Sequence, residues 1–368
     1  MSPVRITTAD GQSVAVTSTT DSVPAWTQRY LGSWWTAEPT TELYGPTVSA
    51  DLAEDELRGY ADVVEQRTPD TVEYAGAELL VAQDGDLITA VQDDRSLAYR
   101  WDPDFRLLRI VGTDETTLAA AAARLARELL RAQLLEDGWA ILHASAVTTT
   151  DGATILTLGN KGAGKTTTAL TLARAGWRLL ANDRVFARVD DGVVRVLPWP
   201  SAAAFGFGLL DALDLYETVR TRLAAGEQMH PTQHQTVTDA LLDGRRTPLW
   251  KANGKGELKP QFWPDQLTSW LSMPLATEGH VVGILFPQIT AGAEPRLVDR
   301  GRGAKDDDFF TAVTEDRYPD VFGLLPPLGD HTVLRERLGG LAHQGVVMNH
   351  DATATALVLK EAVARLDA

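Results

Sequence analysis

Hydrophobic and polar positions alternate with the period of β-strands in the first part of this 368-residue chain. The runs 78–83, 87–92, 97–101 and 106–111 are separated by short aspartate-rich turns, which predicts an antiparallel meander. A hairpin is predicted over 4–16 and a short helix over 52–65. The stretch 20–50 holds several prolines and tryptophans and gives no regular period. We therefore expect residues 1–112 to form a β-rich N-terminal domain.

A helical period replaces this alternation after Thr113-Asp114-Glu115-Thr116, which is typical of a helix start. The helix is expected to reach Glu136, followed by strands over 140–147, 154–158 and 178–181 and a hairpin over 185–197. Residues 113–368 are therefore expected to form a second domain. Further strands are predicted over 280–286, 296–299 and 345–348, and a terminal helix over 352–366. The polar stretch 227–264 is too long for an ordinary connection and indicates either an ordered functional insertion or a mobile lid.

A glycine-rich segment connects one of these strands to a helix predicted over 165–175. It reads G-N-K-G-A-G-K-T over residues 159–166, the pattern of a P-loop in its expected strand–loop–helix context. Glycines let backbone N–H groups surround a phosphate, and the helix start adds the positive end of its dipole. A chance glycine turn is the alternative, which the complete motif disfavours. Binding of ATP with Mg²⁺ is therefore predicted.

The expected nucleotide-binding residues are those of the loop and of the helix start. They are Gly159, Asn160, Lys161, Gly162, Ala163, Gly164, Lys165, Thr166 and Thr167. Lys165 is expected to reach the β- and γ-phosphates, and the Thr166 hydroxyl to ligate Mg²⁺.

Composition restricts the remaining possibilities. The chain has 44% apolar and 23% charged residues, enough for a packed core, and a net charge of −16 that argues against nucleic-acid binding through bulk electrostatics. Cysteine is absent, which excludes disulfides and thiolate metal sites. Because the chain has no apolar signal region and no run of 18 apolar residues, a soluble cytoplasmic protein without a membrane partner is expected. The sequence allows a homo-oligomer but does not define the oligomeric state.

Two further segments flank the loop. His143-Ala144-Ser145-Ala146-Val147 precedes the loop strand, and W-R-L-L-A-N-D-R-V over 177–185 follows the loop helix. With the loop between them, these segments resemble those of HPr kinase/phosphorylase. Over about residues 138–212 the chain is more similar to the HPr-kinase-like serine kinases of natural-product and peptide-modifying gene clusters. The resemblance implies an α/β fold with a P-loop kinase core of the HPr kinase/PEP carboxykinase-like type and a mixed sheet. It also implies a histidine before the loop strand and paired acids after the loop helix.

Two departures separate the chain from HPr kinase itself. In the family, the first of the two paired aspartates is thought to act as the base. In this chain Asn182 stands at that first position, and only the second aspartate, Asp183, is present. The family's E-x-R-G-L-G signature meets Ala203 and Phe205 in place of Glu and Arg. That signature is associated with phosphorolysis, so the resemblance implies neither this reverse reaction nor HPr as the substrate.

Four residues carry the expected catalytic roles: His143, Lys165, Asn182 and Asp183. Asp183 is expected to hold Mg²⁺ together with Thr166, and its alternative role is that of a turn or helix-capping aspartate. Asn182 cannot accept a proton at neutral pH and is expected to orient the acceptor by hydrogen bonding. A core role and a catalytic or phosphate-contacting role both stay open for His143.

Two basic clusters are further candidates for a cation that contacts the transferring phosphoryl group. They are Lys251, Lys255 and Lys259, and Arg300, Arg302 and Lys305. The alternative for each is a solvated basic loop, and the aspartates at 306–308 would partly neutralise the second cluster.

Together these patterns predict a phosphotransferase: an ATP-dependent kinase in a biosynthetic pathway. Its acceptor would be a hydroxyl of a small molecule or of a Ser or Thr in a peptide, and the sequence does not identify it. The alternative is a nucleotide-gated binding or regulatory protein with slow ATPase activity, which the missing first aspartate keeps open.

Overall fold

The computed structural model describes residues 2–254, 256–299, 302–310, 319–327 and 329–366. The fold is a mixed α/β fold with large mixed sheets, and its contacts divide the chain into two compact units. Unit 1 comprises Met1–Trp139 and Thr311–Gly329, and unit 2 comprises Ala140–Phe310 and Asp330–Ala368. No helix within these described ranges is both long and apolar enough to cross a membrane.

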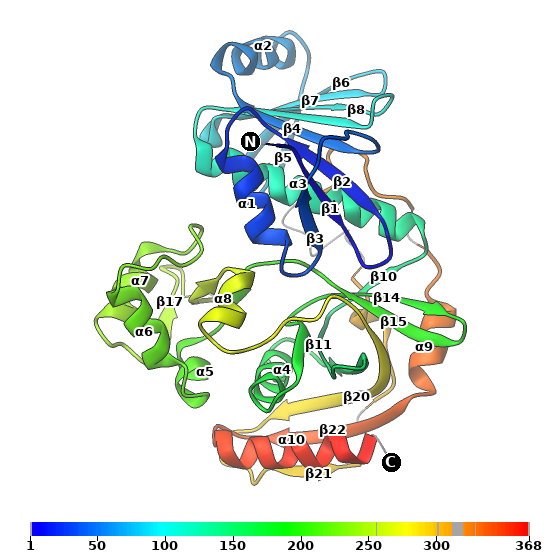
Figure 1. Ribbon diagram of the computed structural model, residues 1–368, viewed down its shortest axis with the longest axis vertical. Helices are drawn as coiled ribbons and strands as arrows, with labels where there is room; N and C mark the ends of the chain where they lie inside the picture. The colour runs from blue at the N-terminus through cyan, green and yellow to red at the C-terminus, as the bar shows by residue number, and fades with distance from the viewer. Residues whose placement is uncertain (1, 255, 300–301, 311–318, 328, 367–368) are drawn as a thin grey trace. The chain divides into compact units, whose positions relative to one another are not determined.

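Unit 1 holds, within its described residues, a nine-stranded sheet in the order β3-β1-β2-β4-β9-β8-β7-β6-β5. Figure 1 labels most of these strands. The strand β4 pairs in parallel with β2 and β9, and the other neighbours pair antiparallel. The predicted hairpin and meander are confirmed. The strands are β1 (Val4–Thr7), β2 (Ser13–Thr17), β3 (Thr36–Pro39), β4 (Thr47–Leu52), β5 (Asp70–Tyr74), β6 (Ala77–Asp84), β7 (Leu87–Gln92), β8 (Leu97–Asp102) and β9 (Leu107–Gly112).

Among the described residues of unit 1, three α-helices pack on this sheet: α1 (Ser22–Leu31), α2 (Glu54–Glu65) and α3 (Glu115–Glu136). The predicted helices at 52–65 and after Thr113 are confirmed, and the Asp114 side chain caps α3 by accepting the Thr117 N–H at 2.8 Å. The helix α1 lies in the stretch where no regular pattern was visible. Pro24 falls in its first turn, where the missing N–H costs no helical hydrogen bond.

The boundary between the units differs from the expected division into 1–112 and 113–368. Helix α3 contacts α1, β2, β4 and β9, so it belongs to unit 1, which continues to Trp139. The later segment Thr311–Gly329 also belongs to unit 1, and the Phe322 ring lies 5.9 Å from that of Tyr99. The alanines of α3 allow this close packing on the N-terminal sheet.

Unit 2 is built on a second mixed sheet, whose main path is β10-β14-β15-β20-β12-β11-β13. Strands β12, β20 and β22 run parallel, whereas β11 is antiparallel to both β12 and β13. Strand β12 therefore has an antiparallel neighbour on one side and a parallel neighbour on the other. The strands are β10 (Ala140–Leu142), β11 (Ala144–Thr148), β12 (Ala153–Leu158), β13 (Arg178–Ala181), β14 (Val185–Asp190), β15 (Val193–Pro198), β20 (Gly279–Ile289), β21 (Arg296–Val298) and β22 (Ala342–Met348).

The single strand expected over 140–147 is in fact two strands separated at His143. Strand β10 pairs with β14, whereas β11 pairs with β12 and β13. The His143 N–H donates to the Asp308 carbonyl at 2.7 Å, outside both ladders. The interruption arises from these different partners, which the local sequence does not reveal.

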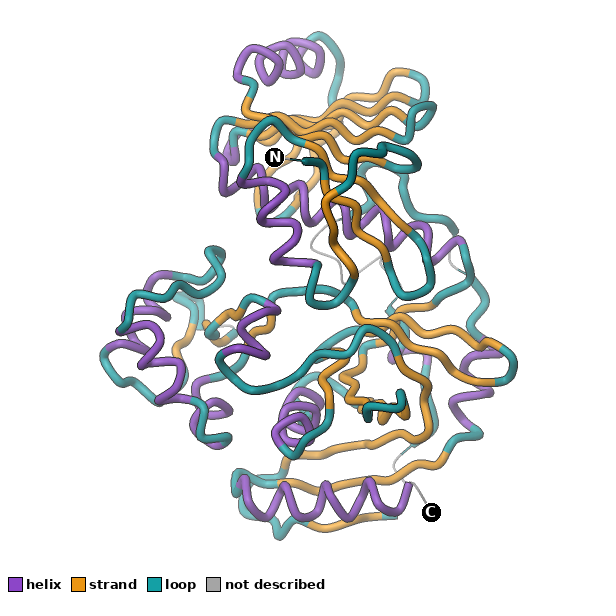
Figure 2. The backbone as a smooth tube through the Cα atoms, in the orientation of Figure 1, coloured by secondary structure: helices purple, strands orange, loops and turns teal. Residues whose placement is uncertain are grey.

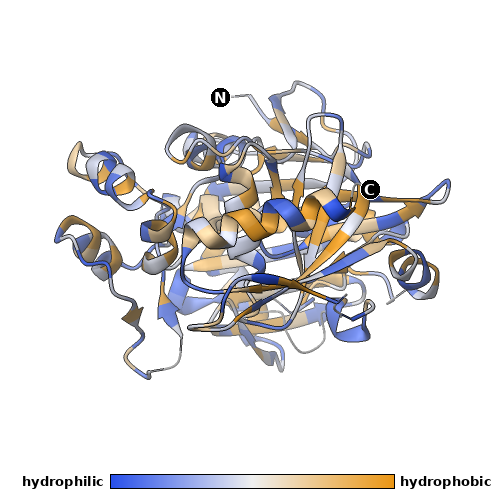
Figure 3. Ribbon diagram, turned by 90° about the horizontal axis from the view of Figure 1, so that it is seen from below, coloured by the Kyte–Doolittle hydropathy of each residue, from blue (hydrophilic) through white to orange (hydrophobic). Residues whose placement is uncertain are grey.

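Helices α4 (Lys165–Arg174) and α10 (Ala352–Leu366) pack on this sheet and on each other. Both positions were predicted, and Figure 3 shows α10 with mixed polar and apolar residues, as expected for an amphipathic helix. Helix α9 (Thr332–Gly339) packs on β14 and β15.

The helices α5 to α8 gather beside the sheet (Figure 2). With the short strands there they are α5 (Phe207–Ala212), α6 (Tyr216–Ala224), α7 (Gln235–Leu242), α8 (Pro264–Ser269), β16 (Ala203–Ala204), β17 (Leu249–Trp250), β18 (Glu257–Leu258) and β19 (Gln261–Phe262). Where the structure describes it, the polar stretch 227–264 therefore contains α7 and the short strands β17, β18 and β19.

Candidate functional site

The carboxyl ends of several strands meet at one edge of the sheet in unit 2. Strands β12, β13 and β20 run in the same direction, so the residues that follow β12 and β13 lie at the same edge as the end of β20. These residues are Gly159 and Asn182-Asp183. In open α/β sheets, ligands bind at this end of the strands.

The loop between β12 and α4, residues 159–164, is termed here the glycine loop. Gly162 and Gly164 have φ of +82° and +110°, a region that favours glycine. A Cβ atom on Gly164 would lie 2.7 Å from Met348 Cε and 2.9 Å from Ile289 Cγ1. Glycine is therefore required at 164 by conformation and by packing. Asn160, Lys161 and Gly162 form the exposed tip of the loop, whereas Ala163 and Thr167 are half-buried.

Lys165 begins α4 and turns its side chain back over the loop. Its Nζ donates to the Gly159 carbonyl at 2.7 Å, and its own carbonyl accepts the Ser145 hydroxyl at 2.8 Å, which fastens the helix start to β11. Burial lowers the pKa of Lys165, an effect that the charges of Asp183 and Asp308 oppose and that of Arg302 reinforces. A half-buried ammonium group that contacts neutral carbonyls favours the arrival of an anion.

Thr166 links the helix start to the end of β13. Its hydroxyl donates to the Asn182 carbonyl at 3.3 Å, and the neighbouring Asp183 side chain is 66% exposed, with a carboxylate oxygen 3.8 Å from Arg184 Nε. A hydroxyl and a carboxylate are hard oxygen donors of the kind that Mg²⁺ takes alongside water and phosphate. No three His, Cys, Asp or Glu side chains gather as a possible metal cage in the described ranges. The donor set therefore fits a cation held jointly with a phosphate ligand.

His143 lies beside an aromatic group at the same edge. Its ring meets that of Phe310 edge-on, with centroids 5.2 Å apart, and the Arg184 guanidinium carbon lies 4.0 Å from the centroid of the Phe310 ring. Phe310 also donates its N–H to the Ile141 carbonyl at 2.8 Å. His143 and Arg184 therefore contact the same ring. His143 lies between β10 and β11, and Arg184 lies between β13 and β14.

Asp308 is a buried acid that sequence reasoning weighed only as a neutralising charge. It is 2% exposed, and both its carboxylate oxygens accept Arg302 N–H groups at 2.5 Å. The local signal is an aspartate directly before Phe309-Phe310, a change from polar to apolar that is typical of a buried segment. Of the two basic clusters, Lys255 and Arg300 lie outside the described residues, and Lys251 and Lys259 are exposed in the segment around β17 to β19.

A polar cavity of about 480 Å³ lies elsewhere in unit 2. It is lined by the turn 148–152 before β12 and by residues 276–280 at the start of β20, together with Arg178 and Arg195. These segments are at the amino ends of the parallel strands, so the cavity is at the edge opposite to the glycine loop. It contains none of the predicted site residues.

Comparisons with known proteins add little to this geometry. No family model matches the chain, and no curated protein matches it. Among solved structures, the chain is similar to the HPr(Ser) kinase/phosphatase of Coxiella burnetii, with 10% identity over 62% of this chain and 99% of that one. The TM-score of 0.27 marks a distant relationship at most and carries no argument about fold or activity. The interpretation of the site therefore rests on the chain's own residues.

Proposed function

We propose that the protein is an ATP-dependent kinase that transfers the γ-phosphoryl group to a hydroxyl. One observation carries the proposal: Lys165 Nζ is held at 2.7 Å from the Gly159 carbonyl, over a glycine loop that enters a helix at the carboxyl edge of a mixed sheet. A bound triphosphate would replace that carbonyl as the partner of the ammonium group. Backbone N–H groups of the glycine loop and the start of α4 would hold the phosphates.

Mg²⁺ would be held by Thr166 and Asp183, directly or through water. When bound, it neutralises charge on the β- and γ-phosphates. The hydrogen bond from the Thr166 hydroxyl to the Asn182 main-chain carbonyl keeps that hydroxyl close to the Asp183 carboxylate, which follows in the chain. Lys165 would then stabilise the charge that develops on the phosphate oxygens during transfer.

The acceptor would enter on the side of His143 and Asn182. Its oxygen forms a bond to the γ-phosphorus, the bond from that phosphorus to the β-phosphate oxygen breaks, and the hydroxyl proton leaves for a nearby base or water. Phosphoryl transfer with a loose transition state depends mainly on positioning and charge neutralisation, so Asn182 can orient the hydroxyl without accepting its proton. Of His143 and Asn182, only the His143 imidazole can accept the proton. A small molecule and a Ser or Thr of a peptide both satisfy this chemistry.

A second function rests on the same residues. Asn182 occupies the position where the resemblance predicts the base, and Asp183 would be committed to the metal. A protein that binds nucleotide, changes its affinity for a partner and hydrolyses ATP slowly would use the glycine loop without an acceptor.

The two functions are separated by acceptor-dependent turnover. The full-length protein is incubated with γ-labelled ATP, Mg²⁺ and a panel of amino acids, nucleosides and Ser- or Thr-containing peptides. A kinase gives a labelled product and ADP release that depends on one acceptor class. Slow ADP release that no acceptor accelerates would favour the regulatory function.

Two variants test the roles within the site. Lys165→Ala is expected to lose turnover under either function, and retained turnover would refute the glycine loop as the nucleotide site. Asp183→Asn is expected to lose the Mg²⁺-dependent part of turnover, and unchanged Mg²⁺ dependence would remove Asp183 from the metal site.

A further inference from the structure

Arg302 is held rigidly by three neighbours. Its Nη1 and Nη2 groups donate to the two Asp308 carboxylate oxygens at 2.5 Å each, and Nη1 also donates to the Gly303 carbonyl at 2.9 Å. The guanidinium carbon lies 5.2 Å from the centroid of the Phe286 ring. The side chain is 24% exposed, so the charge is neither fully solvated nor fully buried. This is not the environment of a basic residue on a solvated loop.

Asp308 is fixed as firmly as its partner. The side chain is almost completely buried, and the carboxylate also accepts the Lys305 N–H at 2.8 Å. A buried carboxylate is costly unless it is paired and hydrogen-bonded, and here both conditions are met. The pair leaves the Nε–H edge of Arg302 without a bond to any described residue.

The segment that carries the pair is attached to the edge where the glycine loop lies. The Asp308 carbonyl accepts the His143 N–H at 2.7 Å, and Phe309 forms a β-bridge with Leu142. Arg302 also contacts Phe286, which is followed in β20 by Pro287. A Cβ atom placed on Gly159 would lie 3.9 Å from the Pro287 carbonyl oxygen. Arg302 therefore packs near the end of β20, on the residue before Pro287, and Pro287 approaches the first residue of the loop. The charges of Arg302 and Asp308 both influence the Lys165 ammonium group, which is consistent with this placement.

We propose that Arg302 contacts the transferring phosphoryl group and that Asp308 is the residue that positions it. The proposal rests on the proposed function, because it assigns a role at that same site. Guanidinium is planar and permanently charged, and it presents donors that match phosphate oxygens, whereas a transferring phosphoryl group spreads negative charge over three oxygens. Asp308 occupies the two Nη groups and directs the remaining edge. Neutralisation by Arg302 would be strongest in the transition state.

The test compares binding of the ground state with binding of a transition-state analogue. Mg²⁺·ADP measures the first, and Mg²⁺·ADP with aluminium fluoride, which imitates the planar phosphoryl group, measures the second. For Arg302→Gln we expect ADP affinity within about 3-fold of the wild type and aluminium fluoride trapping that is at least about 100-fold weaker. Its kcat should fall by about 10³-fold, the lower end of what a transition-state arginine supplies, with little change in KM.

Three further variants separate this role from a structural one. Because Arg302→Gln leaves Asp308 unpaired, the double variant Arg302→Gln/Asp308→Asn removes both charges and should show the same selective loss of trapping. Added guanidinium ion should restore part of the turnover of Arg302→Ala, which a packing defect would not allow. Asp308→Asn alone should lower kcat less than Arg302→Gln does, because the guanidinium remains but is held less firmly.

The matched control is Arg335→Gln. Arg335 binds Asp306 at 2.8 Å in the same acidic run, but the two side chains are 41% and 82% exposed. This variant should bind ADP and trap aluminium fluoride as the wild type does. Full trapping by Arg302→Gln, or by the double variant, would overturn the role of Arg302. If the wild type itself does not bind Mg²⁺·ADP, the proposed function fails instead.

Discussion

The state of Lys165 before a ligand arrives is a property of one residue and its immediate neighbours. Burial lowers its pKa from the ordinary 10.5, while its Nζ contacts the Gly159 carbonyl, a neutral partner. A triphosphate would favour the charged form and raise the pKa again. Nucleotide binding in the alkaline range should therefore be coupled to proton uptake, and affinity should decrease as the pH rises through the lowered pKa of the free protein.

Titration calorimetry of Mg²⁺·ADP in two buffers with different ionisation enthalpies measures this uptake. Lys165→Arg is the matched variant, because arginine stays protonated throughout the range. It should bind without the coupled proton and show a flatter pH profile. Equal proton uptake by the two proteins would assign the titrating group to another residue.

The glycine loop could be predicted because its chemistry is local in sequence, whereas Arg302 and Asp308 could not be placed. Glycines, lysine and threonine at fixed spacing determine the loop geometry within eight positions. The bond from His143 to the Asp308 carbonyl joins residues 165 positions apart (308 minus 143). Only the fold of the whole of unit 2 creates that contact. The pattern D-D-D-F-F indicates a change from an exposed to a buried environment, but it does not indicate where in the fold the buried segment lies.

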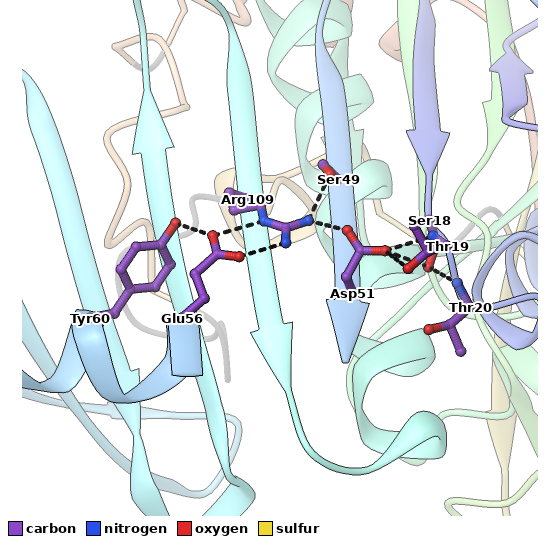
Figure 4. A network of polar contacts seen from close by, with 8 residues as sticks. All are labelled: Ser18, Thr19, Thr20, Ser49, Asp51, Glu56, Tyr60 and Arg109. Carbon is purple, nitrogen blue, oxygen red and sulfur yellow. Dashed lines mark hydrogen bonds and ion pairs between the residues drawn. The ribbon is translucent and has the colours of Figure 1, made fainter. Parts of the chain in front are cut away.

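At the scale of elements, unit 1 contains a polar network that connects its sheet to α2 (Figure 4). Arg109 on β9 binds Asp51 on β4 and both carboxylate oxygens of Glu56 on α2, and the Tyr60 hydroxyl donates to Glu56 at 2.7 Å. Burial and the hydrogen bond to Glu56 raise the pKa of Tyr60 to about 12. The three charged side chains are 16% to 35% exposed, so solvent screens them only in part.

Replacing Arg109 with Gln should lower the free energy of unfolding by about 1–3 kcal/mol, because it leaves two half-buried carboxylates without their cation. Urea unfolding measures the change. Arg58→Gln is the control on the same helix, since Arg58 pairs with Glu54 and Asp55 at the surface. That variant should unfold as the wild type does. Equal effects of the two substitutions would contradict a structural role for the network.

The same network predicts a direction for the dependence of stability on pH. The hydrogen bond from Arg109 holds the pKa of Glu56 below its usual value, against the effect of burial. Burial raises the pKa of Asp51, but hydrogen bonds from Thr19 and Arg109 outweigh it and lower the net value. Groups with lowered folded pKa values stabilise the fold above their unfolded values, here 3.8 and 4.5, and lose this contribution as the pH falls through the folded values. Arg109→Gln should therefore lose less stability than the wild type on acidification.

Elements with a regular period were predictable, and those set by distant partners were not. The meander, the hairpins and helices α3, α4 and α10 follow from alternation, turns and caps. The break at His143 depends on which strands lie beside β10 and β11. The unit boundary at Trp139 depends on the face against which α3 packs, and its Ala- and Leu-rich sequence suits any sheet equally well.

At the scale of the whole molecule, two locations compete as the nucleotide site. One is the glycine loop, and the other is the polar cavity at the opposite edge of the same sheet. Hydrogen exchange measured with and without Mg²⁺·ADP distinguishes them. At a ligand concentration of 100 times Kd, binding stabilises the native state by about 2.7 kcal/mol. Some amides exchange only when a local opening disrupts the binding site, and the exchange rate of these amides should fall by up to about 100-fold.

We expect this slowing in the glycine loop, α4, the residues after β13 and the segment 302–310. Strand β7, in the interior of the unit 1 sheet, serves as the internal reference. Lys165→Ala should abolish the slowing, whereas Arg302→Gln should retain it, because ADP lacks the phosphoryl group that Arg302 contacts. Slowing centred on the turn 148–152 and on residues 276–280 would place the nucleotide in the cavity. That result would contradict both the proposed kinase function and the proposed role of Arg302, because each places the nucleotide at the glycine loop.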